Sequence, residues 1–191
     1  MFSPMIAAEC FTMTSTHHVR AAKTVSCRAV GPANTRMFSA LLSFGSNLGD
    51  RYETLKRAWC ILGQTESIKT VRFSPFYETE PVGGPTGQPM YINAAGIIQT
   101  TVTPTALLGI IQKIESAFGR IRAERWGART LDIDILLYED QIIDLPTLTI
   151  PHAEMLHRQF VLLPAYDIAG EWIHPCTRKT IHEHCNMLKT V

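Results

Sequence analysis

Apolar and polar residues alternate along several short segments of the chain, and two longer segments repeat apolar residues every three or four positions. Short alternation is typical of a strand with one buried face, whereas the longer repeat is typical of a helix that packs on a core. The strands predicted in this way are residues 38–44, 68–79 with a bend at Pro75, 90–100 and 130–138. A short hairpin is expected within residues 142–148.

Two helices are predicted between these strands. The first follows the turn formed by residues 45–50 and ends at Gly63, with an inward stripe of Tyr52, Leu55, Trp59 and Leu62. The second begins at Thr103-Pro104, a favourable pair for a helix start, and ends at Gly119. Its inward residues are Leu107, Leu108, Ile111, Ile114 and Phe118. Further helix is expected in part of residues 155–169 and in 180–188.

The element order is β-α-β-β-α-β, followed by additional C-terminal helices. This order predicts an α+β fold of the ferredoxin-like type, in which two helices cover one face of an antiparallel sheet. The helices are expected to cover the face of the last long strand that carries Leu131, Ile133, Ile135 and Leu137. Asp132 and Asp134 then point to the opposite face, where a substrate groove can form.

Residues 1–36 show no sustained periodicity and end in the turn-forming sequence GPANTR. We expect a disordered or non-native extension there, followed by one domain over residues 37–191. The scarcity of acidic residues in the extension leaves an organelle transit peptide as an alternative. A start-site artefact is favoured, because Met37 directly precedes the first strand. The expected location is therefore cytoplasmic, with an organelle as the alternative.

Composition excludes several classes of protein. A net charge of +1 with 18% charged residues argues against a nucleic-acid partner, and no apolar run is long enough to suggest a membrane partner. The five cysteines are scattered and odd in number, which disfavours a disulfide framework. The histidines and cysteines of residues 174–185 are too closely spaced for a typical zinc site. These histidines are expected on the surface.

Candidate chemistry concentrates in residues 120–138. Asp132 and Asp134 share one strand face about 6–7 Å apart, and paired carboxylates favour a hard divalent cation such as Mg²⁺. Arg120, Arg122, Arg125 and Arg129 lie just upstream. Arginines beside an acidic metal pair suit the binding of a polyphosphate. Ordinary surface charge is the alternative interpretation.

An aromatic residue and an amide share one face of the strand over residues 90–100. Tyr91 offers a ring for stacking, and Asn93 can donate and accept hydrogen bonds at the edge of a heterocycle. Plain packing is the alternative for both residues. Their spacing of two residues keeps them together on whichever face of the sheet they occupy.

Five motifs in order, GSNLGD, SPFYETEP, YINAA, ERWGARTLDIDILLY and IPH, resemble the 6-hydroxymethyl-7,8-dihydropterin pyrophosphokinase family over about residues 38–188. The resemblance implies a ferredoxin-like fold. It also implies transfer of pyrophosphate from MgATP to the hydroxymethyl group of 6-hydroxymethyl-7,8-dihydropterin, with release of AMP, in folate biosynthesis. The expected state is a monomer whose partners are ATP and the pterin.

The resemblance also implies roles for individual residues. Catalytic roles fall on Arg120, Arg129 and Trp126, and two Mg²⁺ ions on Asp132 and Asp134. The implied nucleotide contacts are Gln112, Glu115, Arg122, His152 and Arg158. The implied pterin contacts are Thr79, Tyr91, Asn93 and Phe160.

Two other functions are weighed against this one. An RNA-recognition module shares the topology, but the chain lacks the aromatic strand motif of that class. A catalytically silent domain is disfavoured because Asp132, Asp134, Arg120 and Arg129 are all present.

Overall fold

The computed structural model describes residues 36–119 and 127–188 of the 191-residue chain. Its strands are β1 (Phe38–Ser46), β2 (Ile68–Phe73), β3 (Tyr77–Thr79), β4 (Tyr91–Thr100), β5 (Asp132–Tyr138), β6 (Ile143–Leu145) and β7 (Leu148–Ile150). Its helices are α1 (Arg51–Gly63), α2 (Pro104–Ala117), α3 (Gln159–Ala169) and α4 (Ile181–Leu188). Residues 1–35 lie outside the described residues, so the predictions for this extension, including the domain boundary at residue 36, stay predictions.

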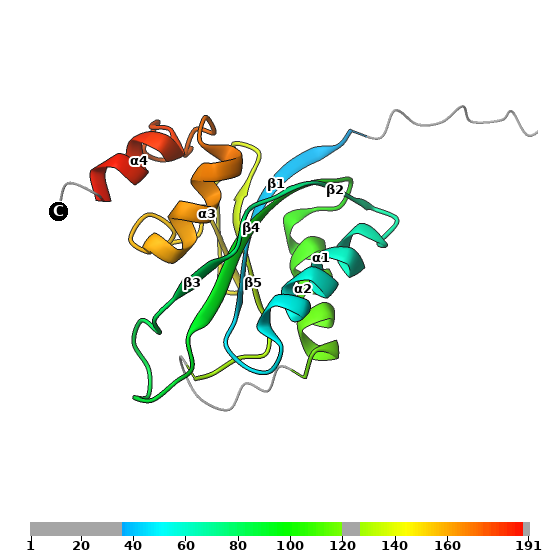
Figure 1. The fold of residues 1–191 in the computed structure, drawn as a ribbon. Helices are drawn as coiled ribbons and strands as arrows, with labels where there is room; N and C mark the ends of the chain where they lie inside the picture. The colour runs from blue at the N-terminus through cyan, green and yellow to red at the C-terminus, as the bar shows by residue number, and fades with distance from the viewer. Residues whose placement is uncertain (1–35, 120–126, 189–191) are drawn as a thin grey trace, which may run out of the picture. The chain divides into compact units, whose positions relative to one another are not determined.

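The main sheet has the strand order β2-β4-β1-β5, with β3 also paired to β4. Each of these pairings is antiparallel. β2 and β3 divide the one strand predicted over residues 68–79 with a bend at Pro75. Counted as that one strand, with α1 after β1 and α2 after β4, they give the ferredoxin-like β-α-β-β-α-β order that the sequence predicted. The hairpin of β6 and β7 and the helices α3 and α4 are added after β5 (Figure 1).

Helices α1 and α2 begin where the sequence places a capping residue. The Asp50 side chain accepts a hydrogen bond from the Glu53 N–H at 3.1 Å, and the Thr103 hydroxyl accepts one from the Ala106 N–H. Such caps satisfy backbone N–H groups that have no partner inside the helix. Both helices therefore begin at fixed points and present one apolar stripe each to the sheet.

The sheet face under α1 and α2 carries the larger apolar core. Leu55 and Leu62 of α1 and Leu107 and Ile111 of α2 are buried against it. Burying a leucine or isoleucine side chain contributes about 1.5–3 kcal/mol. These residues of the two predicted stripes lie where the sequence placed them, whereas Tyr52 is exposed and stacks edge-on against Phe76.

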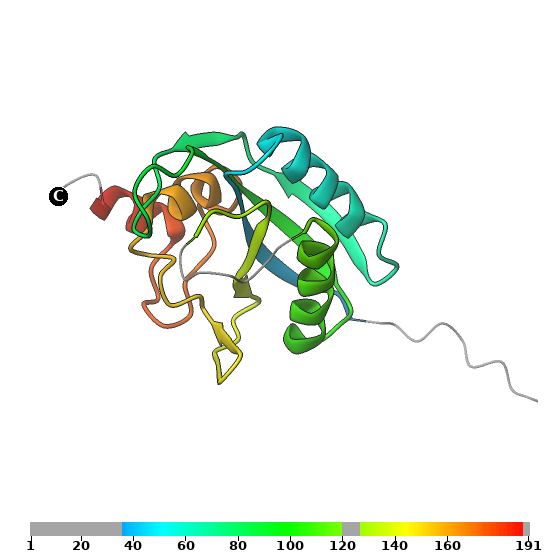
Figure 2. The same ribbon diagram turned by 90° about the horizontal axis from the view of Figure 1, so that it is seen from below.

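Helix α3 packs on the opposite face, and α4 packs on α3, as Figure 2 shows from below. Leu41 of β1, Ala95 and Ile97 of β4, and Leu162 and Ala165 of α3 are buried together there. This second core occupies one end of the face. The other end carries the cleft described in the next subsection.

The prediction that Leu137 shares the face of Ile133 and Ile135 is wrong. Leu42 is paired with Ile135 and Leu41 with Leu137, so β5 contains one extra residue, Leu136, relative to β1. An extra residue of this kind is a β-bulge, and it reverses the alternation beyond it. Leu136 and Leu137 consequently join the core under α3, on the face opposite to Ile133 and Ile135.

The prediction that the C-terminal histidines lie on the surface is wrong for His174. Only 6% of His174 is exposed, and its ring lies 5.8 Å from the ring of His184. Burial is the main cause that lowers the pKa of His174, and the neighbouring His184 lowers it further. Burial is also the main cause that lowers the pKa of His184. In the part of the chain that the structure describes, no helix is long and apolar enough to cross a membrane.

Candidate active site

A cleft of about 590 Å³ opens on the sheet face opposite to α1 and α2. Its floor comes from β1, β4 and β5, and its walls come from residues 79–88, Arg129 and the turn before α3. The lining residues are Ser43, Gly45, Thr79, Glu80, Pro81, Val82, Gly83, Gln88, Tyr91, Asn93, Arg129, Asp132, Asp134, His152, Glu154, His157, Arg158, Phe160 and Val161.

The sheet register sets the floor of the cleft. Gly45 of β1 is paired with Asn93 on one side and with Asp132 on the other. Neighbouring strands are about 4.8 Å apart, so Asn93 and Asp132 lie about 10 Å apart, with only a glycine between them. Ser43 is paired with Asp134 one step along the same face. An amide and two carboxylates therefore share one open surface.

The Asn93 end of the floor is a polar pocket with an aromatic wall. Asn93 is buried, and its Nδ2 donates a hydrogen bond to the Thr79 Oγ1 at 2.8 Å. This bond fixes the orientation of the amide. Tyr91 lies on the same strand face two residues away, and a Cβ atom at Gly45 would come within 3.8 Å of its ring. The absence of a side chain at Gly45 keeps this end of the floor open.

Tyr91 is a hydrogen-bond donor at neutral pH. Burial raises the pKa of its phenol, and the Asp132 carboxylate adds to the rise while Arg129 opposes it. The hydroxyl lies 3.5 Å from the carbonyl oxygen of Gly127, which is the first residue described after residues 120–126. Tyr91 therefore contacts both the floor beside Asn93 and the chain just before Arg129.

Two arginines line the cleft, and one of them is ion-paired with Asp132 on the floor. The Arg129 Nη1 donates to the Asp132 Oδ2 at 2.6 Å, and both side chains are partly accessible to solvent. Arg158 approaches from the turn before α3, with its guanidinium carbon 5.9 Å from the centre of the Phe160 ring. An arginine and a carboxylate held together in this way can bind an anion and a cation side by side.

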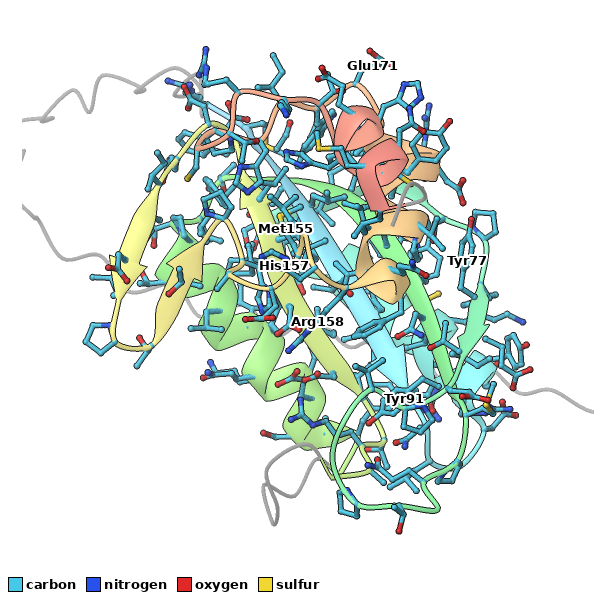
Figure 3. All side chains as sticks on the ribbon, turned by 90° about the vertical axis from the view of Figure 1, so that its left-hand side faces the viewer. Tyr77, Tyr91, Met155, His157, Arg158 and Glu171 are labelled. Atoms are coloured by element: carbon cyan, nitrogen blue, oxygen red, sulfur yellow. The ribbon has the colours of Figure 1, made fainter. Side chains whose placement is uncertain are left out.

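The turn before α3 completes this wall. The His152 N–H donates to the Leu136 carbonyl at 3.0 Å, which attaches the turn to β5. The His152 Nδ1 accepts a hydrogen bond from the Glu154 N–H, leaving Nε2 as its second polar atom. Figure 3 shows His157 and Arg158 together on this turn, and Tyr91 at the far end of the same face.

The chain matches a protein-family model over most of its length. Residues 41–170 match the model described as "7,8-dihydro-6-hydroxymethylpterin-pyrophosphokinase (HPPK)". This match covers well over half of the chain. The chain belongs to the HPPK family.

Curated relatives agree with the family match. A 2-amino-4-hydroxy-6-hydroxymethyldihydropteridine pyrophosphokinase of Haemophilus influenzae is 43% identical over 139 residues, which are 73% of this chain and 86% of that protein. The enzyme of the same name from Synechocystis is 39% identical over 142 residues, 74% of this chain and 72% of that protein.

Solved structures resemble the fold. The Plasmodium falciparum HPPK-DHPS crystal structure with pteroate matches with a TM-score of 0.65 at 18% identity, over 81% of this chain. The chain spans 43% of that longer protein. At this identity the likeness concerns the fold alone, and it agrees with the ferredoxin-like topology.

The cleft brings together most of the site residues that the sequence predicted. Those that line it are Thr79, Tyr91, Asn93, Arg129, Asp132, Asp134, His152, Arg158 and Phe160. Arg120, Arg122 and Trp126 lie outside the described residues, as does Arg125. Their roles in the HPPK reaction stay predictions.

Gln112 and Glu115 lie on α2 and are not among the residues that line the cleft. Only 2% of Glu115 is exposed, and its Oε1 accepts a hydrogen bond from the Ile133 N–H at 2.8 Å. This contact supports the strand that carries the aspartates. The nucleotide contacts predicted for both residues stay predictions.

Several lining residues were not singled out from the sequence. Ser43 and Gly45 belong to the first strand, where only the pairing with β4 and β5 reveals that they face the cleft. Glu154 and His157 follow the predicted His152 in the same turn. Residues 80–89 are rich in glycine and proline, and this composition does not indicate which side chains face inward.

Proposed function

We propose that the chain uses this cleft to transfer the pyrophosphoryl group of ATP to the hydroxymethyl oxygen of 6-hydroxymethyl-7,8-dihydropterin, releasing AMP in folate biosynthesis. Membership of the HPPK family supports this reaction. The structural observation that carries the assignment to this cleft is the shared floor, on which the Asn93 amide and the Asp132 carboxylate flank Gly45.

The heterocycle is assigned to the Asn93 end of the floor. A pterin ring presents adjacent donors and acceptors, which an oriented amide and the Thr79 hydroxyl can match. Tyr91 and Phe160 both line the cleft and offer aromatic surfaces for its faces. The bound ring then directs its hydroxymethyl group along the floor towards Asp132.

The triphosphate is assigned to the Asp132 end. Arg129 and Arg158 supply planar donors for phosphate oxygens, and His152 adds a ring nitrogen. Glu80 and Glu154 also line the wall, Glu154 on the same turn as His152. The arginines hold the β-phosphorus in line with the pterin oxygen.

Asp132 and Asp134 fit Mg²⁺ by their chemistry. Within residues 36–119 and 127–188, no group of three or more histidine, cysteine, aspartate or glutamate side chains is arranged to hold a metal by itself. A pair of carboxylates suits Mg²⁺, which keeps waters and substrate phosphates as its other ligands. Bound Mg²⁺ neutralises charge on the transferred group. Two ions are proposed, in keeping with the family resemblance.

The reaction is an in-line displacement. The hydroxymethyl oxygen bonds to the β-phosphorus, the bond from that phosphorus to the oxygen bridging the α-phosphate breaks, and the hydroxyl proton passes to water. The raised pKa of Tyr91 keeps its hydroxyl protonated, so that residue is a donor and not a general base. Catalysis rests on alignment and on charge neutralisation.

Product analysis tests the proposal. Incubated with MgATP and the pterin, the protein should release AMP in step with the pyrophosphorylated pterin, and omission of the pterin should suppress AMP. The control is Asp144→Asn, which alters an exposed carboxylate on β6 and should behave like the wild type. ADP as the main product, or AMP formed equally without pterin, would contradict the assignment.

A further inference from the structure

Asn47 lies in the turn between β1 and α1, where two segments that border the cleft approach each other. It is 1% exposed and does not line the cleft itself. Its backbone N–H donates to the Arg129 carbonyl at 3.0 Å, and its side-chain Oδ1 accepts from the Arg129 N–H at 2.7 Å. Both backbone groups of Arg129 are therefore bonded to Asn47.

The other end of the same amide contacts the opposite wall. The Asn47 Nδ2 donates to the Gln88 Oε1 at 3.2 Å and lies 3.4 Å from the Pro89 carbonyl oxygen. Gln88 lines the cleft, and Pro89 is two residues before Tyr91. An amide has its acceptor and its donors on different atoms, so one side chain can hold two segments at once.

The two segments carry different parts of the site. Arg129 is ion-paired with Asp132, at the end of the cleft assigned to the triphosphate. Pro89 leads into Tyr91 and Asn93, at the end assigned to the heterocycle. Because Asn47 is buried, its hydrogen bonds are shielded from competing water and hold a defined distance.

We propose that Asn47 is a positioning residue that couples the two substrate subsites by tying the Gln88–Pro89 segment to Arg129. The coupling rests on the proposed function, since it requires a polyphosphate at one end and a pterin at the other. Occupation of one subsite orders a segment that the other subsite shares through Asn47. Binding of each substrate then strengthens binding of the other by the same factor.

A role limited to folding is the competing explanation, and the surrounding contacts separate the two. The Arg51 Nη1 donates to the Glu78 Oε1 at 2.8 Å and to the Met90 carbonyl at 2.6 Å, so both ends of the loop are held independently of Asn47. A folding role predicts a lower melting temperature with unchanged coupling between substrates. A positioning role predicts lost coupling in a protein that still folds.

The measurement is the dissociation constant of the pterin, with and without Mg²⁺ and α,β-methylene-ATP, in which the bond to be broken is replaced. The ratio of the two constants is the coupling factor, and we expect it to be at least about tenfold in the wild type, within the usual range for coupled sites. Asn47→Ala should reduce it at least about fivefold. It should also lower kcat at least about tenfold, because small misplacements of reacting groups are costly.

Three further variants sharpen the test. Gln88→Met removes the acceptor for the Asn47 Nδ2 and should lose part of the coupling. The double variant Asn47→Ala/Gln88→Met should show no less coupling than Asn47→Ala alone, because both changes break the same link. Thr86→Ala alters an exposed residue of the same loop and should keep the wild-type factor.

The outcomes distinguish this inference from the function on which it rests. Wild-type coupling and kcat in Asn47→Ala, while the wild type forms AMP, would overturn the positioning role alone. A coupling factor near one in the wild type itself would also overturn the positioning role. If Asn47→Ala does not fold, unchanged coupling in Gln88→Met overturns it. A wild type that forms no AMP contradicts the proposed function and the inference together.

Discussion

The two faces of the main sheet use the same strands for different purposes. On the face under α1 and α2, Phe44, Trp59 and Phe73 pack ring against ring, with centroids 4.8–5.9 Å apart. On the other face, Asn93 and Asp132 lie in an open cleft, where hydrogen bonds and an ion pair hold them. The first face is filled by apolar side chains, whereas the second is filled only at the end under α3 and is kept open by a glycine at the end that carries the cleft.

The contrast teaches how binding residues are held without a core of their own. In β5, Ile133 and Ile135 are buried in the larger core, while Asp132 and Asp134 alternate with them and face the cleft. Because side chains alternate along a strand, packing on one face also fixes the backbone that carries the polar side chains of the other face. Substitutions on the packed face should change stability, and those in the cleft should change substrate binding and turnover.

The largest expected effect is on turnover. Asp132→Asn and Asp134→Asn should each lower kcat by on the order of 10² or more, because metal charge stabilisation is worth several kcal/mol. The free energy of unfolding should change by no more than about 1 kcal/mol, since Asn keeps the shape of the side chain and a partly accessible ion pair such as Arg129–Asp132 contributes little. Steady-state kinetics at saturating Mg²⁺ and urea unfolding check the two halves. Near-normal activity in both variants would contradict the statement that cleft residues determine turnover.

The next effect is on stability. A Cβ atom at Gly96 would lie 2.6 Å from the Trp59 Cζ3 and 3.0 Å from the Phe44 Cε2, so Gly96→Ala should destabilise the fold by about 1–3 kcal/mol. The matched control is Gly109→Ala in α2, which meets nothing within 4 Å and should stabilise by about 0.5–1 kcal/mol. Denaturant unfolding of both variants decides. Equal changes in the unfolding free energy of the two variants would show that crowding at Gly96 does not affect stability.

A third glycine, Gly45, extends the comparison of the two faces to the cleft. A Cβ atom at Gly45 would lie 3.4 Å from the Asn93 Oδ1, an ordinary contact distance, so Gly45→Ala should fold normally. It should raise the KM for the pterin several-fold by narrowing the floor, while AMP remains the nucleotide product. An unfolding free energy lowered as much as in Gly96→Ala would mean that the floor is core and not cleft.

The smallest expected effect is a pH dependence outside both regions. The pKa values of His174 and His184 are lowered in the folded state, so the unfolded chain binds protons first as the pH falls. Their contribution to stability is full above about pH 6.5 and is lost as the pH falls below that value. The loss is at most about 1.4 kcal/mol per pH unit for each histidine. Urea unfolding of the wild type and of His174→Gln at several pH values should show a weaker pH dependence of the unfolding free energy in the variant. An identical pH profile in the two proteins would count against this cause.

Local pattern was enough to predict the elements and the pair of aspartates. The alternation of Ile133 and Ile135 with Asp132 and Asp134 is visible in the sequence, because a straight strand has a fixed period of two. The same rule failed at Leu137, because the bulge at Leu136 depends on how β5 pairs with β1. Pairing partners far apart in the sequence leave no local pattern.

The residues that complete the site depend on such long-range pairing. Gly45 acquires its place between Asn93 and Asp132 only when β1 lies between β4 and β5. Asn47 is 82 residues from Arg129, and nothing near either residue indicates the contact. The family resemblance supplied residue types and roles, whereas the register supplied the arrangement of the floor.

The central claim is that metal and pterin bind to one floor, about two strand spacings apart. Paramagnetic relaxation by Mn²⁺ tests it directly on the pterin proton resonances, in the presence of α,β-methylene-ATP. We expect strong broadening of these resonances in the wild type and in Asp144→Asn, since strand spacing places the two ends of the floor about 10 Å apart. Broadening should be lost in the double variant Asp132→Asn/Asp134→Asn while the pterin stays bound. Equal broadening in the double variant, or sharp resonances of pterin bound to the Mn²⁺-loaded wild type, would contradict the claim.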